Sequence, residues 1–143
     1  MMKALCLFVC ASIVLLAAGG CSTAAKGPSD MEALQKVMND CAAVAATKDI
    51  SKLMTYFSET FQSSGSASFD KPGFKDFLDG AKDSGLLDGL EIDLKDAKPV
   101  IQNGVATVTP IHVHVNAGAP EAAFTAKKEK GVWKITEMEI SGI

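Results

Sequence analysis

The chain of 143 residues contains no arginine, so all 14 of its basic side chains are lysines. Arginine is the side chain that grips phosphate groups, carboxylates and base edges with two parallel hydrogen bonds. Seventeen acidic residues outnumber the lysines and leave a formal net charge of −3. A mildly acidic chain without arginine is a poor binder of nucleic acid, and it is unsuited to clamping a phosphorylated ligand. We therefore expect no nucleic-acid partner.

Cysteine is also scarce once the beginning of the chain is set aside. Cys6 and Cys10 lie within an apolar run, and Cys21 follows the two glycines that end it. Only Cys41 remains beyond them, and one cysteine cannot form an intrachain disulfide. The folded part must therefore depend on its hydrophobic core. Cys41 shares a helical stripe with Val37, so we expect it to pack as a small apolar side chain rather than react as a thiol.

The apolar run at the start of the chain is too short to cross a membrane. It extends from residue 4 to 18, fifteen residues, against roughly 20 for a spanning helix. Lys3 precedes it, and the small residues Gly19 and Gly20 follow it. A basic start, a short apolar core and small residues at its end are typical of a secretory signal, which we place at residues 1–20.

The segment Gly19-Gly20-Cys21-Ser22 resembles the lipobox of bacterial lipoproteins, although Ala18 stands where that motif usually has leucine. The resemblance implies cleavage between Gly20 and Cys21 and attachment of diacylglycerol to the Cys21 thiol. Ser22, in place of aspartate, implies the outer membrane facing the periplasm. The alternative is ordinary secretion with cleavage nearby, which would leave Cys21 as a free thiol.

Residues 21–29 form the predicted lipidated tether, and residues 30–143 form a single folded domain. The eight residues from Ser22 to Ser29 are small and polar, with no apolar periodicity. They span at most about 26–29 Å when fully extended. The tether would therefore hold the domain close to the bilayer.

Three helices are predicted at the start of the domain. The first spans residues 30–47, where apolar residues recur at steps of three and four. A short second helix is capped by Asp49 or Ser51 and ends at Phe57. The third spans residues 70–85, with an aspartate cap and a proline in its first turn.

Beyond Gly85 the apolar period changes to two, which indicates strands. Residues 61–68 leave room for only a brief strand and a turn. Asn103-Gly104 predicts a two-residue hairpin turn, and Glu129-Lys130-Gly131 predicts a second hairpin. The order of elements predicts an α+β domain with three helices packed on an antiparallel sheet.

Two of the predicted strands change the face that carries their apolar residues. The parity shifts between Val108 and Ile111, on either side of Pro110, and again between Ile135 and Met138. Such a shift is typical of a β-bulge. Two bulged strands predict a strongly curved sheet.

Residues 46–54, 103–108 and 131–135 resemble three segments of the nuclear transport factor 2-like (NTF2-like) superfamily. This superfamily includes ketosteroid isomerases and SnoaL-like polyketide cyclases. The resemblance implies a cone, in which helices pack inside a curled sheet that often encloses a pocket. A cystatin-like relative and a simple helix-on-sheet domain without a pocket are the alternatives.

His112 and His114 are the only histidines, and their spacing puts both on one face of a strand. They could bind a metal or carry a proton. Ile111 and Val113 are better candidates for the inner face, so we expect both imidazoles to point outward. A metal would need a third ligand, and Glu121 is the nearest carboxylate in the sequence. We assign no metal site.

The enzymes of the superfamily use an aspartate, or a histidine–aspartate pair, together with a tyrosine that faces the pocket. No motif in this chain matches these residues one by one, so we assign no catalytic residue and no cofactor. The candidate pocket residues are aromatic or aliphatic side chains on the predicted helices and strands. They are Tyr56, Phe74, Phe77, Val113 and Trp133.

The favoured hypothesis is a cell-envelope lipoprotein, held by its lipid, whose domain binds a small apolar ligand or a partner protein without catalysis. The second is an enzyme of the isomerase or cyclase type acting on a small apolar substrate. The third is a structural module that forms a homodimer through the open sheet face. A cavity of roughly 300 Å³ or more, with or without a titratable group on its wall, would discriminate among them.

Overall fold

The computed structural model describes residues 29–142 of the chain. The predicted signal, its cleavage site between Gly20 and Cys21, and residues 21–28 of the tether lie outside this range. The helices are α1 (Asp30–Ala46), α2 (Ile50–Leu53), the 3-10 helix η1 (Met54–Tyr56) and α3 (Lys71–Asp83). The strands are β1 (Phe57–Gly65), β2 (Glu91–Asp93), β3 (Lys98–Gln102), β4 (Val105–His114), β5 (Glu121–Glu129) and β6 (Val132–Ser141). None of the described helices has the length and apolar character needed to cross a membrane.

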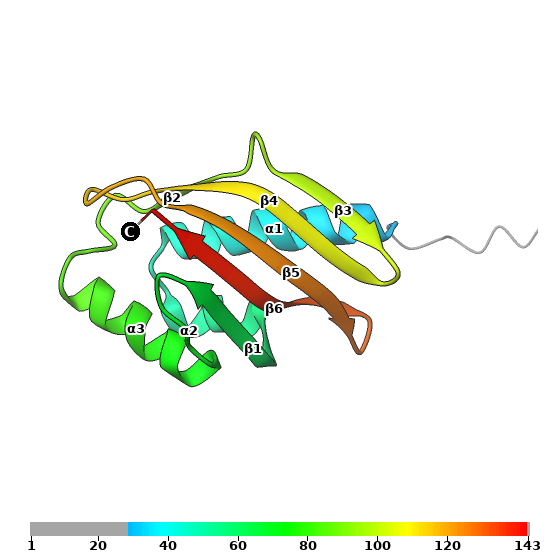
Figure 1. Ribbon diagram of the computed structural model, residues 1–143, viewed down its shortest axis with the longest axis horizontal. Helices are drawn as coiled ribbons and strands as arrows, with labels where there is room; N and C mark the ends of the chain where they lie inside the picture. Colours follow the sequence, from blue (N-terminus) through cyan, green and yellow to red (C-terminus); the bar gives the residue numbers. More distant parts are fainter. Residues whose placement is uncertain (1–28, 143) are drawn as a thin grey trace, which may run out of the picture.

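Six strands form one curved sheet, and the helices lie against it (Figure 1). The strand order is β1-β6-β5-β4-β2, and β3 also pairs with β4. All pairs are antiparallel except β1 and β6, which run parallel. The long helix α1 passes behind the central strands, whereas α2 and α3 lie beside β1 (Figure 1). The predicted α+β architecture, three helices on a strongly curved sheet, is confirmed, with one parallel pair added.

The helices begin at the polar residues that the sequence indicates. Ser29 caps α1 by accepting a hydrogen bond from the backbone N–H of Glu32, whose carboxylate accepts one from the N–H of Ser29 in return. Asp49, rather than Ser51, caps α2. Asp70 caps α3 by accepting a hydrogen bond from Gly73. Each cap satisfies a backbone N–H that the first helical turn leaves unpaired.

Both hairpin turns contain two residues with positive φ. The predicted Asn103-Gly104 turn is confirmed, with φ values of 52° and 74°. The second turn is shorter than predicted, because Glu129 remains paired in β5 and only Lys130-Gly131 turns, with φ values of 51° and 80°. Positive φ at both central positions is the type I′ pattern, whose twist matches that of the paired strands.

Both predicted bulges are present. The register of β4 against β5 shifts between Val108 and Ile111. In β6, Thr136 is the extra residue, because Ile135 and Glu137 face consecutive residues of β5. The Thr136 hydroxyl lies 3.2 Å from the carbonyl of Thr125 and donates a hydrogen bond to it. The two bulges bend the sheet around the helices.

Strand β1 is longer than the sequence pattern predicts, and Phe57 begins it rather than ending the second helix. Two buried serines, Ser58 and Ser63, interrupt its apolar alternation. Ser58 donates a hydrogen bond to Glu129, and Ser63 accepts one from the N–H of Phe69. Its partner β6 lies at the other end of the domain sequence, so no local pattern encodes the parallel pairing.

Candidate functional site

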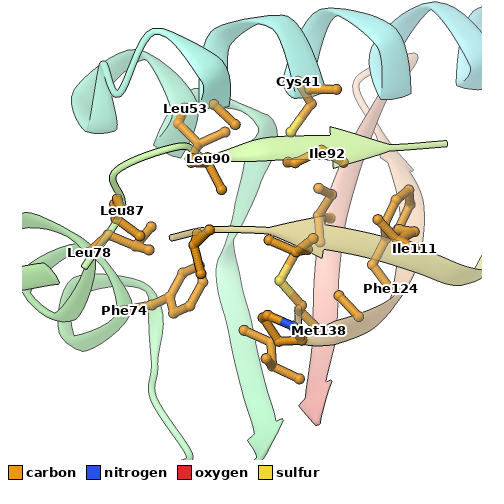
Figure 2. Close-up of a pocket in the computed structure, with 18 of the residues that line it drawn as sticks. Cys41, Leu53, Phe74, Leu78, Leu87, Leu90, Ile92, Ile111, Phe124 and Met138 are labelled. Carbon is orange, nitrogen blue, oxygen red and sulfur yellow. The ribbon is translucent and has the colours of Figure 1, made fainter. Parts of the chain in front are cut away.

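A cavity of about 270 Å³ lies between the helices and the sheet. Its wall is drawn in Figure 2, with Cys41 of α1 on one side and Phe74 of α3 on another. Ile111 of β4 and Met138 of β6 contribute the sheet side of the wall. The same curvature that the bulges introduce therefore leaves an internal space that the helices cover without filling.

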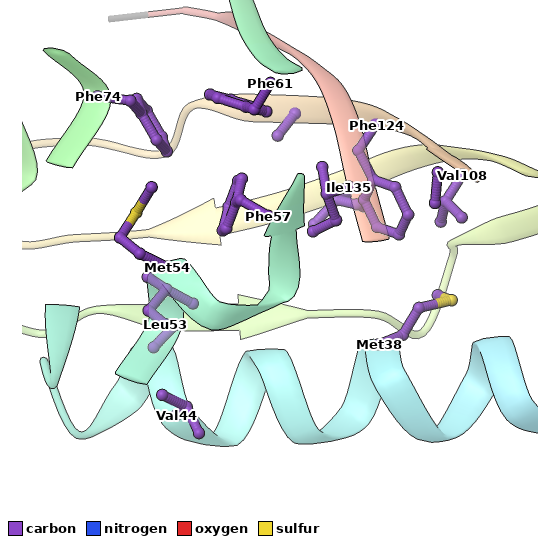
Figure 3. Close-up of a cluster of buried hydrophobic side chains, with 14 of the residues drawn as sticks. Met38, Val44, Leu53, Met54, Phe57, Phe61, Phe74, Val108, Phe124 and Ile135 are labelled. Atoms are coloured by element: carbon purple, nitrogen blue, oxygen red, sulfur yellow. The ribbon is translucent and has the colours of Figure 1, made fainter. Parts of the chain in front are cut away.

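The cavity lies within the hydrophobic core, whose buried side chains are drawn in Figure 3. Phe57, Phe61 and Phe74 form an aromatic cluster with ring centroids 4.8–5.7 Å apart. Phe61 and Val108 are fully buried. Phe57 and Phe74 also line the cavity, so this packed aromatic cluster supplies part of its wall.

The wall of the cavity is apolar throughout. Its residues are alanine, valine, leucine, isoleucine, methionine, phenylalanine, proline and glycine, together with the single thiol of Cys41. No carboxylate, imidazole, ammonium or hydroxyl group belongs to the described wall. The wall therefore offers shape and hydrophobic contact, without a group suited to moving a proton.

One end of the cavity is bounded by exposed residues, which mark its rim. Leu86 and Gly142 both line the cavity and are exposed, Leu86 to 39%. Two loops form this rim, one between α3 and β2 and the other between β4 and β5. The N–H of Asn116 donates a hydrogen bond of 2.7 Å to the carbonyl of Asp88, which joins the two loops. The ammonium of Lys48 lies 2.6 Å from the Asp88 carboxylate and ties the first loop to the end of α1.

The start of α1 lies at the end of the domain opposite the rim of the cavity. Trp133 is 2% exposed, and its ring N–H donates a hydrogen bond of 3.2 Å to the carbonyl of Asp30, the first residue of α1. Lys128 forms an ion pair with Asp30, and its ammonium lies 5.5 Å from the centroid of the Trp133 ring. The length of α1 therefore separates the entry of the chain from the rim of the cavity.

Of the five candidate pocket residues, three line the cavity. Phe74, Phe77 and Val113 belong to its wall, whereas Tyr56 and Trp133 do not. Trp133 is the core residue beside the start of α1, and Tyr56 is half-buried in η1. Both are large aromatic side chains, which is why the sequence suggested wall positions, but neither contributes to the wall.

The sequence analysis did not identify the contributions of α1, of α2, of the loop after α3 and of β2. Cys41, Leu53, Leu90 and Ile92 line the cavity from these elements. The spacing of these apolar residues in the sequence indicates only that they face the interior, as part of a buried stripe. A stripe shows which side chains face inward, but it does not show whether another side chain fills the space that they face.

Cys41 is the one titratable group on the wall, and Figure 2 shows its sulfur directed toward the cavity. Burial raises the pKa of the Cys41 thiol to about 12. The neutral thiol is therefore the dominant form at neutral pH, and a neutral thiol is a weak nucleophile. Cys41 behaves as part of the apolar wall.

The two histidines lie outside the cavity. Ile111 and Val113 line it, so His112 and His114, which alternate with them along β4, belong to the outer face of the sheet. The imidazole of His112 has Nε2 3.5 Å from the Asp96 carboxylate and Nδ1 3.9 Å from that of Glu121. Within residues 29–142, no group of three histidine, cysteine or acidic side chains is placed to hold a metal ion.

Comparisons with known proteins show the fold. No family model and no curated protein matches the sequence. A Nostoc punctiforme protein of unknown function with a cystatin-like fold is similar, with a TM-score of 0.64 at 12% identity over 80% of this chain and 93% of its own. An NTF2-like protein from Novosphingobium aromaticivorans gives 0.61 at 15% identity, over 78% of this chain and 80% of its own. An NTF2-like protein of unknown function from Pseudomonas putida gives 0.64 at 9% identity, over 77% of this chain and 84% of its own. The described domain therefore has the NTF2-like, cystatin-like fold.

Proposed function

We propose that this protein binds a small apolar ligand in the cavity between its helices and its sheet, without transforming it. The observation that carries the proposal is a cavity of about 270 Å³ whose described wall has no polar side chain apart from the Cys41 thiol. Ligand cavities are mostly apolar and begin at roughly 300 Å³. The volume is close to the lower end of that range, which suits one small molecule.

The energetics favour an occupant. Protein cores contain few voids larger than a water molecule, because side chains facing a void lose their dispersion contacts. The volume of this cavity, about 270 Å³, is several times the roughly 30 Å³ that one water molecule takes up in the liquid. Each methylene group that a ligand transfers from water to the cavity contributes about 0.8 kcal/mol. A hydrophobic ligand thus restores the contacts that the wall lacks.

The isomerase or cyclase hypothesis finds little support in the wall. Acid–base catalysis needs a positioned proton donor or acceptor within hydrogen-bond reach of the substrate. The described wall supplies only the thiol of Cys41, whose high pKa makes it a poor base at neutral pH. Binding therefore accounts for the site better than catalysis does.

The proposal extends to location: the protein acts as a lipid-anchored protein of the cell envelope. The resemblance of Gly19-Gly20-Cys21-Ser22 to a lipobox supports this part. A tether joined at Ser29 would leave the rim of the cavity free, because the start of α1 lies away from the rim.

Two neighbouring alanines of α1 provide a matched test of binding. Ala42 lines the cavity, whereas Ala43 is exposed and does not. The Cys21→Ala protein, purified without detergent, should bind the neutral fluorescent probe N-phenyl-1-naphthylamine. Ala42→Phe should fill part of the cavity and weaken binding by about tenfold or more, a change of about 1.4 kcal/mol. Ala43→Phe should leave the affinity unchanged.

Circular dichroism would confirm that both variants are folded. A parent protein that does not bind the probe, or an Ala42→Phe variant that binds it as tightly as Ala43→Phe does, would contradict the proposed function.

A further inference from the structure

The hairpin between β5 and β6 concentrates positive charge in an acidic chain. Residues 127–134, which we name the basic hairpin, contain four lysines and one acidic residue, whereas the whole chain has 17 acidic residues against 14 lysines. The lysines are Lys127, Lys128, Lys130 and Lys134. The two loops at the rim of the cavity, residues 84–91 and 115–121, contain no lysine. Positive charge is therefore gathered at one end of the domain.

Three of these lysines have no ionic partner in the domain. Lys127, Lys130 and Lys134 form no ion pair within residues 29–142. Lys134 donates a hydrogen bond of 2.5 Å to the carbonyl of Thr55, which carries no net charge. Trp133 is buried, so Lys134 and the directly opposite Lys127 lie on the outer face of the sheet. Like charges in opposite positions destabilise a sheet, so this pair is better suited to a negatively charged surface than to an isolated domain.

The carboxylates near the basic hairpin do not cancel its charge on the outer face. Asp30 and Glu32 belong to α1, which packs against the inner face, and Asp30 is paired with Lys128. Glu129, the one acidic residue of the basic hairpin, accepts a hydrogen bond from the buried hydroxyl of Ser58. The acidic side chains are therefore held by partners within the domain, whereas the lysines on the outer face are not.

Exposed apolar side chains accompany the lysines. Val132 of the basic hairpin is 51% exposed, and Met31 of α1 is 41% exposed. The hydrogen bond from Trp133 to the carbonyl of Asp30 holds the basic hairpin against the start of α1, at the same end of the domain (Figure 1). Lysines beside exposed apolar side chains suit a membrane interface, where the ammonium groups meet the head groups and the apolar atoms leave water.

Resting on the lipid-anchored location proposed above, we propose that the basic hairpin docks the domain onto the anionic surface of a phospholipid bilayer. Lys127, Lys130 and Lys134 face the head groups, and Val132 lies among them. This attraction is diffuse and needs no arginine, because each lysine near such a surface strengthens binding by about fivefold as a point charge. A short tether adds an effective concentration in the millimolar range, so weak docking is sufficient. The docked domain directs the rim of its cavity away from the bilayer.

Vesicle sedimentation with the Cys21→Ala protein measures docking without the lipid anchor. The protein should bind vesicles of equal parts phosphatidylglycerol and phosphatidylcholine at least about tenfold more tightly than vesicles of phosphatidylcholine alone. Added salt should reduce this difference, because it screens exposed charges. Equal binding to both vesicles, or no binding to the anionic ones, would overturn the inference. Probe binding in the cavity and acylation of Cys21 are measured separately, so either result would leave the proposed function standing.

Lysine variants locate the docking surface. Lys127→Gln with Lys130→Gln should weaken binding to the anionic vesicles by about tenfold or more, the scale of two lysines at the membrane. Lys82→Gln with Lys98→Gln removes the same charge from exposed positions on α3 and β3, and it should leave the binding unchanged. Circular dichroism would confirm that both variants are folded. Binding that responds equally to both pairs, or to neither, would overturn the role assigned to the basic hairpin.

Discussion

At the scale of single residues, the reactivity of the Cys41 thiol shows how well the cavity wall is shielded from water. Its thiol lies on the wall, and burial raises its pKa to about 12 from the ordinary 9.0. The deprotonated form is the reactive one, so raising the pKa lowers the fraction that can react at a given pH. Below pH 9 that fraction falls tenfold for each unit by which the pKa is raised.

We therefore expect Cys41 to be alkylated by iodoacetamide at pH 8 at least about a hundredfold more slowly in the folded protein than in the urea-unfolded protein. Mass spectrometry of the peptide that contains Cys41 would follow the reaction separately from the other cysteines. Decanol should slow it further by occupying the cavity. Folded and unfolded rates within a fewfold of each other would show that the thiol is not shielded.

At the scale of elements, the loop between α3 and β2 depends on a glycine. Gly89 has a φ of 74°, and a Cβ atom on it would lie 2.4 Å from the side-chain oxygen of Asn116. Residues other than glycine pay roughly 1–2 kcal/mol for this left-handed conformation. Gly89 thus allows the loop to approach Asn116 closely enough for the hydrogen bond between the two rim loops.

Two glycine-to-alanine substitutions should change stability in opposite directions. Gly89→Ala should lower the free energy of unfolding by about 1–2 kcal/mol, because it combines backbone strain with the contact at Asn116. Gly80→Ala lies in the interior of α3 with nothing within 4 Å of the new Cβ, and it should raise stability by roughly 0.5–1 kcal/mol. Urea denaturation would measure both. A Gly89→Ala protein as stable as the parent would argue against a strained, closely packed rim.

Elements whose signals are local could be predicted from the sequence, and those that depend on distant partners could not. Asp70 and Asn103-Gly104 specify a helix start and a turn through their own side chains and backbone, and the parity shift at Pro110 marks a bulge within one strand. Strand β1 pairs in parallel with a segment at the far end of the domain and buries serines, so its periodicity is weak. The cavity wall was found only in part, since an inward stripe such as that of Cys41 looks the same whether it faces a void or a neighbour.

At the scale of the whole molecule, the start of α1 and the rim of the cavity lie at opposite ends of the domain. α1 contains 17 residues, and at 1.5 Å per residue it separates them by roughly 25 Å. The tether of Ser22 to Ser29 reaches at most about 26–29 Å. A lipid at Cys21 would therefore hold the domain near the bilayer while its cavity opens at the far end.

Loss of the thiol at residue 21 should release the protein. We expect mass spectrometry of membrane-extracted protein to find acyl groups on Cys21, and we expect Cys21→Ala to move the protein to the soluble fraction. Cys41→Ala is the matched control, because it removes a thiol within the domain and should leave the protein on the membrane. Unmodified Cys21 in mature protein would refute the anchor without affecting the cavity.

The position of Gly142 on the rim has a practical consequence for anyone handling this protein. An affinity tag fused after the last residue would begin beside the opening of the cavity and could narrow it or enter it. A fusion partner joined ahead of Ser29 would begin beside Trp133, at the other end of α1, and would leave the opening clear. Sensors or immobilised forms of the protein should therefore be attached through the N-terminal side.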